Sequence, residues 1–133
     1  MIDFKRTITN DGIAIVRVEG WLEEFACPYF VGCMEDLIKD GHREIVIDCT
    51  NLGLLSSACL SSLIKARRRA VKSGGRIILA KANSSILEVI GFLGLKSLFG
   101  IYPTCDQALI KIRRKLRKQR RKNVDQDSVL VGT

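Results

Sequence analysis

The sequence predicts a single α/β domain in which a mixed β-sheet of four to five strands is covered by about four helices. Short apolar runs of strand length alternate with longer segments whose apolar residues recur at helical spacing, a pattern typical of a largely parallel sheet with helices packed against it. The first two runs flank Asn10, Asp11 and Gly12, the chemistry of a tight hairpin turn, so one antiparallel pair makes the sheet mixed. With 133 residues and 47% apolar content, the chain is long enough for one domain with its own core.

The first elements in chain order are a hairpin and a helix. Residues 4–9 and 13–19 alternate apolar with polar side chains, as expected of strands with one buried face. Apolar residues recur at helical spacing over 26–40, where Pro28 suits a first helical turn and Gly41 supplies a stop.

Two strands and a helix follow in the middle of the chain. The β-branched run 44–49 is typical of a strand buried in a parallel sheet and completes a βαβ unit. Over 57–72, apolar residues line one helix face and basic residues the other, and the small residues 73–75 end that helix. Residues 76–80 form the next apolar strand.

Capping residues mark the last elements. Ser85 and Glu88 have the spacing of a capping box, so a helix is expected from there to about residue 93. Residues 98–102 form a short strand, and Thr104 opens a second box of the same spacing at the start of a final helix.

The formal charge of +8 is concentrated in one short segment. Residues 1–110 carry +1, residues 111–122 carry +9 and residues 123–133 carry −2. A near-neutral domain over 1–112 is therefore expected to continue into a basic helical extension and a mobile C-terminal tail over 113–133. This distribution disfavours a fold whose whole surface is built for nucleic acid.

The basic extension is a separate candidate for binding. Its helix could dock on the domain with its charges solvated, or it could bind nucleic acid or another polyanion, an acidic protein or an anionic membrane surface. No aromatic residues interleave with the bases to stack on single strands, so binding to nucleic acid would be independent of sequence. The candidate polyanion contacts are Lys111, Arg113, Arg114, Lys115, Arg117, Lys118, Arg120, Arg121 and Lys122.

The five cysteines show neither a metal-binding nor a disulfide pattern. No two are spaced as C-x-x-C and His42 is the single histidine, so a zinc site is not expected. Their odd number leaves at least one unpaired and Cys49 falls in an apolar strand, which favours a reducing compartment over a secreted disulfide framework. Since neither a signal peptide nor an apolar stretch near the roughly 20 residues of a membrane span is visible, a cytoplasmic protein is predicted.

Few residues favour catalysis. His42, beside a helix stop, is the single candidate base and has no nucleophile placed near it. Glu23 and Glu24 could form an acid pair, but a solvated loop explains them better. The glycine patterns that bind phosphate are missing. We therefore expect no enzymatic activity, no metal and no cofactor.

The most informative segment is the turn between a strand and a helix at 48–60. Small hydroxyl residues open the helix, and Ser56 or Ser57 could serve as its N-cap. A serine in this place also faces free backbone N–H groups and the positive end of the helix dipole, which would accommodate a phosphate. Such a phosphate would add roughly −1.5 to −2 charges and change what the surface binds.

This segment resembles the sulphate transporter and anti-sigma factor antagonist (STAS) domain. The family pattern is an apolar strand ending in Asp-Leu, a short loop, and then Asp-Ser-Ser-Gly-Leu at the start of the second helix. The same positions here read Asp48-Cys49 and Ser56-Ser57-Ala58-Cys59-Leu60. Further matches lie at 20–23, 65–79, 93–99 and 107–109. The resemblance covers about 4–112 and implies a STAS fold.

The resemblance also implies a regulatory protein that binds a kinase. In STAS antagonists the second serine of the motif is phosphorylated by a partner kinase of the GHKL ATPase type, which is also the anti-sigma factor. That position is Ala58 here, which has no hydroxyl. Two hypotheses follow: a fixed, always binding-competent antagonist, or a phosphorylation switch moved to Ser57. The first is favoured because a shift of one residue turns a helical side chain by about 100°.

The resemblance places the partner contacts in the loop and the first turn of this helix. The expected contact residues are Leu54, Leu55, Ser56, Ser57, Ala58 and Cys59. Cys59 replaces the glycine of the family motif and is expected to add a thiol to the contact surface.

Overall fold

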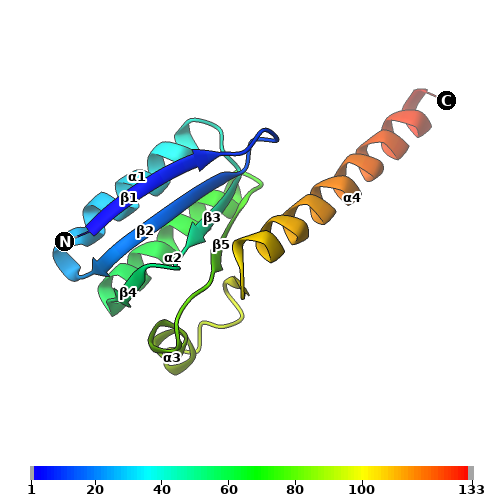
Figure 1. Ribbon diagram of the computed structural model, residues 1–133. Helices are drawn as coiled ribbons and strands as arrows, with labels where there is room; N and C mark the ends of the chain where they lie inside the picture. Colours follow the sequence, from blue (N-terminus) through cyan, green and yellow to red (C-terminus); the bar gives the residue numbers. More distant parts are fainter. Residues whose placement is uncertain (1, 132–133) are drawn as a thin grey trace.

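The computed structural model describes residues 2–131, with residues 125–131 described by their backbone alone (Figure 1). In chain order the elements are β1 (Ile2–Ile8), β2 (Ala14–Leu22), the 3-10 helix η1 (Glu24–Ala26), α1 (Cys27–Lys39), β3 (Glu44–Asp48), β4 (Leu52–Leu55), α2 (Ser57–Lys72), β5 (Arg76–Ala80), α3 (Ser84–Phe92), β6 (Gly100–Tyr102) and α4 (Cys105–Val131). The predicted α/β fold is confirmed, with the opening hairpin and the alternation of strands and helices in place.

Six strands form one mixed sheet. Its main path runs β1-β2-β3-β5-β6, and β4 pairs with the end of β2. β1 is antiparallel to β2, and the other pairings are parallel. The sequence-based count of four to five strands omits β4, because its four residues include Gly53 and read as a loop. In the fold, Leu54 and Leu55 pair with Trp21 and Leu22 of β2.

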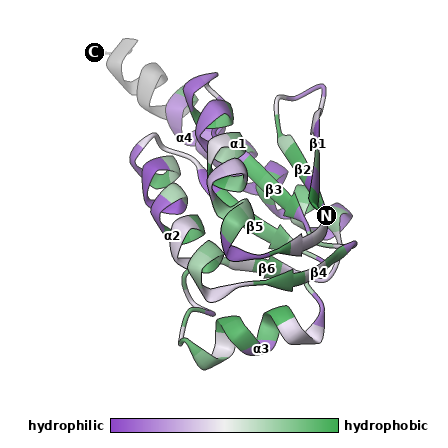
Figure 2. Cartoon of the chain, turned by 90° about the vertical axis from the view of Figure 1, so that its left-hand side faces the viewer, coloured by the Kyte–Doolittle hydropathy of each residue, from purple (hydrophilic) through white to green (hydrophobic). Residues whose placement is uncertain are grey.

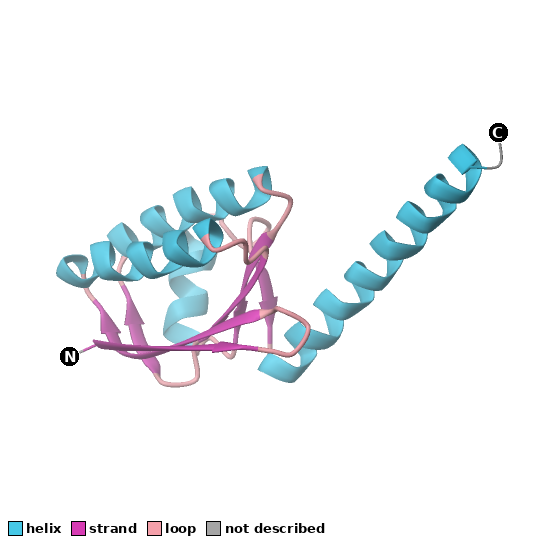
Figure 3. Cartoon of the chain, turned by 90° about the horizontal axis from the view of Figure 1, so that it is seen from above, coloured by secondary structure: helices cyan, strands magenta, loops and turns pink. Residues whose placement is uncertain are grey.

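Helices cover both faces of the sheet (Figure 3). α1 and α2 lie side by side on one face and enclose the main core, with fully buried side chains such as Phe30, Leu63 and Ile47. Burying each of these side chains contributes about 1.5–3 kcal/mol relative to leaving it exposed. The first turns of α4 cover part of the other face through Ala108 and Ile112, in a smaller second core.

Glycines and a threonine set the ends of three helices as predicted. α1 and α2 end before Gly41 and Gly74, whose φ angles of +90° and +83° are adopted by glycine without a Cβ penalty. At the start of α4, Thr104 Oγ1 accepts a hydrogen bond from the backbone N–H of Gln107 at 3.1 Å. This bond confirms Thr104 as the cap of the last helix.

The predicted cap of α3 is wrong by two residues. Asn83, not Ser85, caps the helix, since its side-chain oxygen accepts a hydrogen bond from the backbone N–H of Ile86 at 2.9 Å. The amide nitrogen of Asn83 also donates to the backbone oxygen of Leu52 at 3.0 Å. One side chain therefore starts α3 and ties it to β4, the strand that precedes α2.

α4 is a continuous helix that leaves the domain (Figure 1). Arg113 donates hydrogen bonds to both carboxylate oxygens of Asp11 in the hairpin turn, at 2.8 and 3.1 Å, and these bonds hold the pKa of Asp11 well below its usual range. The boundary expected at residue 112 thus falls inside this helix. α4 also continues through the segment expected to be a tail as far as Val131, and residues 132–133 lie outside the described residues.

Candidate functional site

α2 begins directly after β4, at the edge of the sheet where the parallel strands end. Ser56 has an extended backbone and caps the helix, because its Oγ accepts a hydrogen bond from the backbone N–H of Cys59 at 3.2 Å. Ser57 is the first helical residue and is exposed. The sequence allowed either Ser56 or Ser57 as the N-cap of α2. Ser56 is the N-cap, and Ser57 is exposed at the surface.

The expected contact residues divide between the surface and the core. Leu54 and Ser57 are exposed, and Ser56 and Ala58 are half-buried. Two others are buried and cannot offer their side chains to a partner, namely Leu55 and Cys59. The accessible part of the predicted site is therefore Leu54 together with residues 56–58.

Cys59 forms a disulfide with Cys27, with Cα atoms 5.0 Å apart, within the usual range of about 4.4–6.8 Å. For this pair, the reading that the cysteines show no disulfide pattern is wrong. The fold explains the pairing: Cys27 begins α1 and Cys59 lies in the first turn of α2, and both helices start where the paired parallel strands β2 and β4 end. Because both residues are buried, Cys59 does not add a thiol to the surface.

The other three cysteines are unpaired thiols. Burial raises the pKa of Cys49 to about 12. Burial, together with the neighbouring carboxylate of Asp48, raises the pKa of Cys105 to about 11, and burial also raises the pKa of Cys33. These thiols stay protonated at neutral pH, so none of them is an activated nucleophile.

Exposed aromatic side chains border the start of α2, and no pattern in the sequence distinguishes them from core residues. Trp21, Phe25 and Tyr29 are 60%, 66% and 72% exposed. Trp21 lies beside Leu54 across the β2–β4 pair, and its indole covers Gly53 so closely that a Cβ there would come within 2.7 Å of Nε1. Aromatic residues are enriched in protein interfaces, so these three are candidate contact residues.

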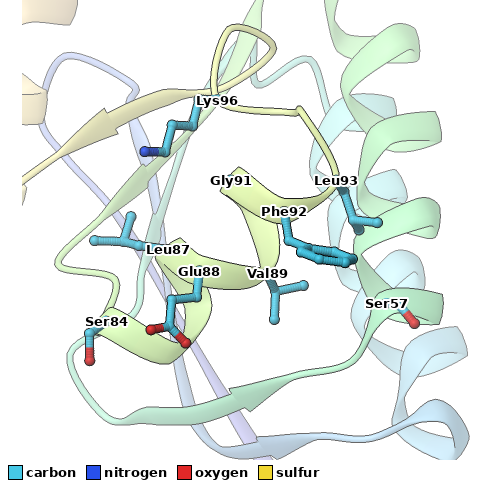
Figure 4. A pocket seen from close by; sticks show the side chains of 9 residues that line it. All are labelled: Ser57, Ser84, Leu87, Glu88, Val89, Gly91, Phe92, Leu93 and Lys96. Carbon is cyan, nitrogen blue, oxygen red and sulfur yellow. The ribbon is translucent and has the colours of Figure 1, made fainter.

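A groove of about 870 Å³ separates α3 from the start of α2 (Figure 4). Ser57 forms the α2 side, and Phe92, which is 92% exposed, stands on the α3 side. α3 is hydrophobic along most of its length (Figure 2). The remaining lining residues are Ser84, Leu87, Glu88, Val89, Gly91, Leu93 and Lys96.

Asp48 fixes the turn that leads from β3 into β4. Thr50 donates to its Oδ1 from the backbone N–H at 3.0 Å and from the hydroxyl at 2.5 Å, and Arg17 Nε lies 3.5 Å from Oδ2. Desolvation by burial raises the pKa of this carboxyl, but the hydrogen bonds from Thr50 and its other partners outweigh that effect and hold the pKa below its usual value. The ionised carboxylate thus helps to set where β4, and then α2, begins.

The candidate catalytic residues do not converge. His42 follows the C-terminal end of α1, about 20 Å from the disulfide end at 1.5 Å per residue. Glu23 and Glu24 precede α1, where Glu23 is half-buried and Glu24 is exposed. Over residues 2–124, whose side chains the structure describes, no group of three or more His, Cys, Asp or Glu could hold a metal ion. No described helix has both the length and the apolar character needed to cross a membrane.

The basic residues of α4 lie apart from the start of α2. Arg113 is half-buried and paired with Asp11, whereas the other eight basic residues of 111–122 are exposed. The helix that carries them docks on the opposite face of the sheet and projects away from the domain (Figure 1). The structure therefore holds two separate candidate surfaces.

Comparison with known proteins identifies relatives of this fold. A sequence model described as the STAS domain matches residues 5–108. An anti-sigma factor antagonist from Mycobacterium paratuberculosis is 25% identical with a TM-score of 0.76, over 85% of this chain and 95% of that one. The unphosphorylated anti-sigma factor antagonist SpoIIAA is 20% identical with a TM-score of 0.73, over 84% of this chain and 96% of that one. The phosphorylated Bacillus cell fate determinant SpoIIAA is 19% identical with a TM-score of 0.66, over 83% of this chain and 99% of that one.

Proposed function

The chain belongs to the STAS domain family, and from that premise we propose that it is a non-catalytic regulatory protein that binds a protein partner through the exposed start of α2. The observation that carries the proposal is the apolar surface around that turn. Trp21 and Leu54 are exposed beside each other across the β2–β4 pair, and Phe92 is exposed on the groove that Ser57 lines, although each could contribute to stability if buried. A cluster of exposed apolar side chains at one place marks an interaction surface.

The partner we propose is a kinase-type anti-sigma factor of the GHKL class, in a partner-switching pathway of the cytoplasm. Support comes from the relatives of the same fold that are anti-sigma factor antagonists. Ala58, at the position of the family's phosphoserine, lacks the atom that would accept a phosphate. We therefore favour an antagonist that binds its kinase constitutively, with Ser57 as the alternative phosphate acceptor.

Pull-down with candidate GHKL-type kinases, followed by radiolabelled ATP, tests this mechanism. We expect stable binding without labelling, and no labelling in the wild-type protein or in Ser57→Ala. Ser61→Ala is the matched control, since Ser61 is also an exposed serine on α2. Labelling that disappears in Ser57→Ala but persists in Ser61→Ala would replace the constitutive mechanism by a switch at Ser57. Failure of every such kinase to bind would remove the mechanism.

Substitution of Phe92 tests whether the groove is part of the contact. Phe92→Ala should weaken kinase binding by about tenfold or more, because buried aromatic anchors commonly contribute over 1–2 kcal/mol to an interface. Val71→Ala is the control, since Val71 is also exposed but lies in the last turn of α2, at its opposite end. Equal loss in both variants would contradict a contact centred on the groove.

The basic segment of α4 supports a second candidate function, binding of nucleic acid or another polyanion. Eight of its basic residues are exposed on a helix that projects from the domain. Truncation is a poor test because Ile112, which packs in the second core, lies within the same helix. The better variant replaces Lys118, Arg120, Arg121 and Lys122 with glutamine. A mobility-shift assay at two salt concentrations should show binding that falls with salt and with these substitutions. Equal binding by the wild-type protein and by this variant would exclude the basic segment as the binding site.

A further inference from the structure

The disulfide lies directly beneath the surface to which we assign partner binding. Cys27 is the first residue of α1 and Cys59 the third residue of α2, so the bond joins the first turns of two neighbouring helices. Exposed Phe25 and Tyr29 flank Cys27 along the chain, and Ser57 precedes Cys59 by two residues. A change at this bond is therefore transmitted to side chains on the contact surface.

The surroundings of the two sulfur atoms suit the reduced form as well as the oxidised one. The backbone oxygen of Glu23 lies 3.4 Å from Cys59 Sγ and 3.6 Å from Cys27 Sγ, and Ser56 Oγ lies 3.9 Å from Cys27 Sγ. In the disulfide these are contacts without a hydrogen. In the dithiol each S–H has an oxygen acceptor at hand, so reduction leaves no buried donor unsatisfied.

Ser56 links the state of the sulfurs to the cap of α2. Its Oγ accepts the hydrogen bond from Cys59 N–H that closes the first turn. After reduction, the thiol of Cys27 becomes a second donor directed at the same oxygen, and two sulfurs that are no longer bonded need more space in a closely packed core. The loss of the covalent link and the added space that the sulfurs need loosen the first turn of α2, whereas the second lone pair of Ser56 Oγ can accept the thiol without loss of the cap.

We propose that Cys27–Cys59 is a reversible disulfide modification site that controls partner binding at the start of α2, with a thioredoxin-class dithiol protein as the exchange partner. This proposal rests on the proposed function. The disulfide form holds the two first turns in place and binds the kinase more tightly, because a pre-ordered surface loses less freedom on binding.

The exchange conserves atoms and electrons. A thiolate of the dithiol protein attacks the sulfur of Cys27, the less buried of the two residues, at 6% exposure against 0% for Cys59. A mixed disulfide forms, and Cys59 leaves as a thiolate that the positive end of α2 stabilises before it takes up a proton. The second thiol of the dithiol protein then displaces Cys27. Two electrons and two protons pass to the cysteine pair, and the dithiol protein becomes the disulfide.

Alkylation and mass spectrometry of the full chain test the exchange. The protein is treated in its folded state with thioredoxin, its reductase and NADPH, then alkylated under denaturing conditions. Three cysteines should be alkylated before treatment and five after it, and reoxidation should restore three. A pair that stays oxidised in the folded protein under these conditions would overturn the proposal.

Kinase binding and amide exchange test whether the disulfide controls partner binding. The Kd for the kinase should rise about tenfold on reduction and in the Cys27→Ser, Cys59→Ser double variant, whereas Cys33→Ser, at an unpaired cysteine, should not change it. Hydrogen exchange at the Cys59 amide should speed up on reduction. Equal Kd values for the oxidised and the reduced protein would overturn the proposal that the disulfide controls binding. If no kinase binds either form, the proposed function fails, and unchanged amide exchange would then overturn the redox proposal separately.

Discussion

Reduction of the Cys27–Cys59 disulfide should destabilise the fold by an amount that follows from its position in the chain. The bond spans a sequence separation of 32 residues. The loop-closure relation for a cross-link of that length gives about 12 cal/mol/K of entropy removed from the unfolded chain, or about 3.7 kcal/mol at 25 °C. This is a large share of the free energy of unfolding of a typical domain, about 5–15 kcal/mol.

Urea unfolding with and without a reductant measures this difference. The single tryptophan, Trp21, reports by fluorescence from the edge of the sheet near the disulfide, and circular dichroism reports the helices. With an m-value of about 1–3 kcal/mol/M, the midpoint should fall by about 1.2–3.7 M.

The double variant Cys27→Ala, Cys59→Ala separates the cross-link from the packing of the sulfurs. It should resemble the reduced protein and no longer respond to the reductant. Cys33→Ala, at an unpaired and half-buried cysteine, should keep the full response. Oxidised and reduced proteins that differ by less than about 1 kcal/mol would refute the loop-closure reasoning.

Two further predictions concern contacts that hold the sheet and its turns in place. Gly75→Ala should destabilise the protein by about 1–3 kcal/mol or more in urea unfolding, because the new Cβ would come within 1.9 Å of the backbone oxygen of Arg43, whereas Gly32→Ala, with no atom within 4 Å of its Cβ, should be neutral or stabilising. Thr50→Val should raise the pKa of Asp48 in an NMR titration by removing the hydroxyl donor. The lowered pKa of Asp48 stabilises the fold at pH values above 3.8, the pKa of the unfolded chain, and this contribution is lost as the pH falls through the pKa of the folded protein. The variant should therefore lose less stability on acidification. An unchanged Asp48 titration would contradict the role of Thr50.

The elements with a local periodic signal could be predicted from the sequence, and those that depend on distant partners could not. The hairpin around Asp11 and the amphipathic α2 follow from alternation and helical spacing within one segment. β4 has four residues with a glycine among them, and it becomes a strand only because the end of β2 lies beside it. The cap of α3 was misplaced for a related reason: Asn83 is also held by Leu52 of β4, a contact that spacing along α3 does not reveal.

The candidate site shows the same division. The motif at 56–60 indicates where α2 begins, and Ser56 caps it as one of the two options allowed. The exposure of Trp21 and Phe92 depends on how β4 and α3 are placed, so no local pattern distinguishes them from core residues. The disulfide is hidden for a similar reason, since each of its cysteines reads as an apolar helix position until the two helices are set side by side.

Two departures from the family motif fall in adjacent residues of one helical turn. Ala58 removes the hydroxyl on which a phosphate would be placed, and Cys59 replaces the glycine with a residue that ties the turn to α1. A phosphate acts on this turn by charge, whereas a disulfide acts by restricting its position, and either can alter what the surface binds. Under the two proposals, Ala58, which lacks a phosphate acceptor, is followed directly by one cysteine of the redox pair. The two proposals together predict a first turn of α2 that responds to thiol oxidation and not to phosphorylation.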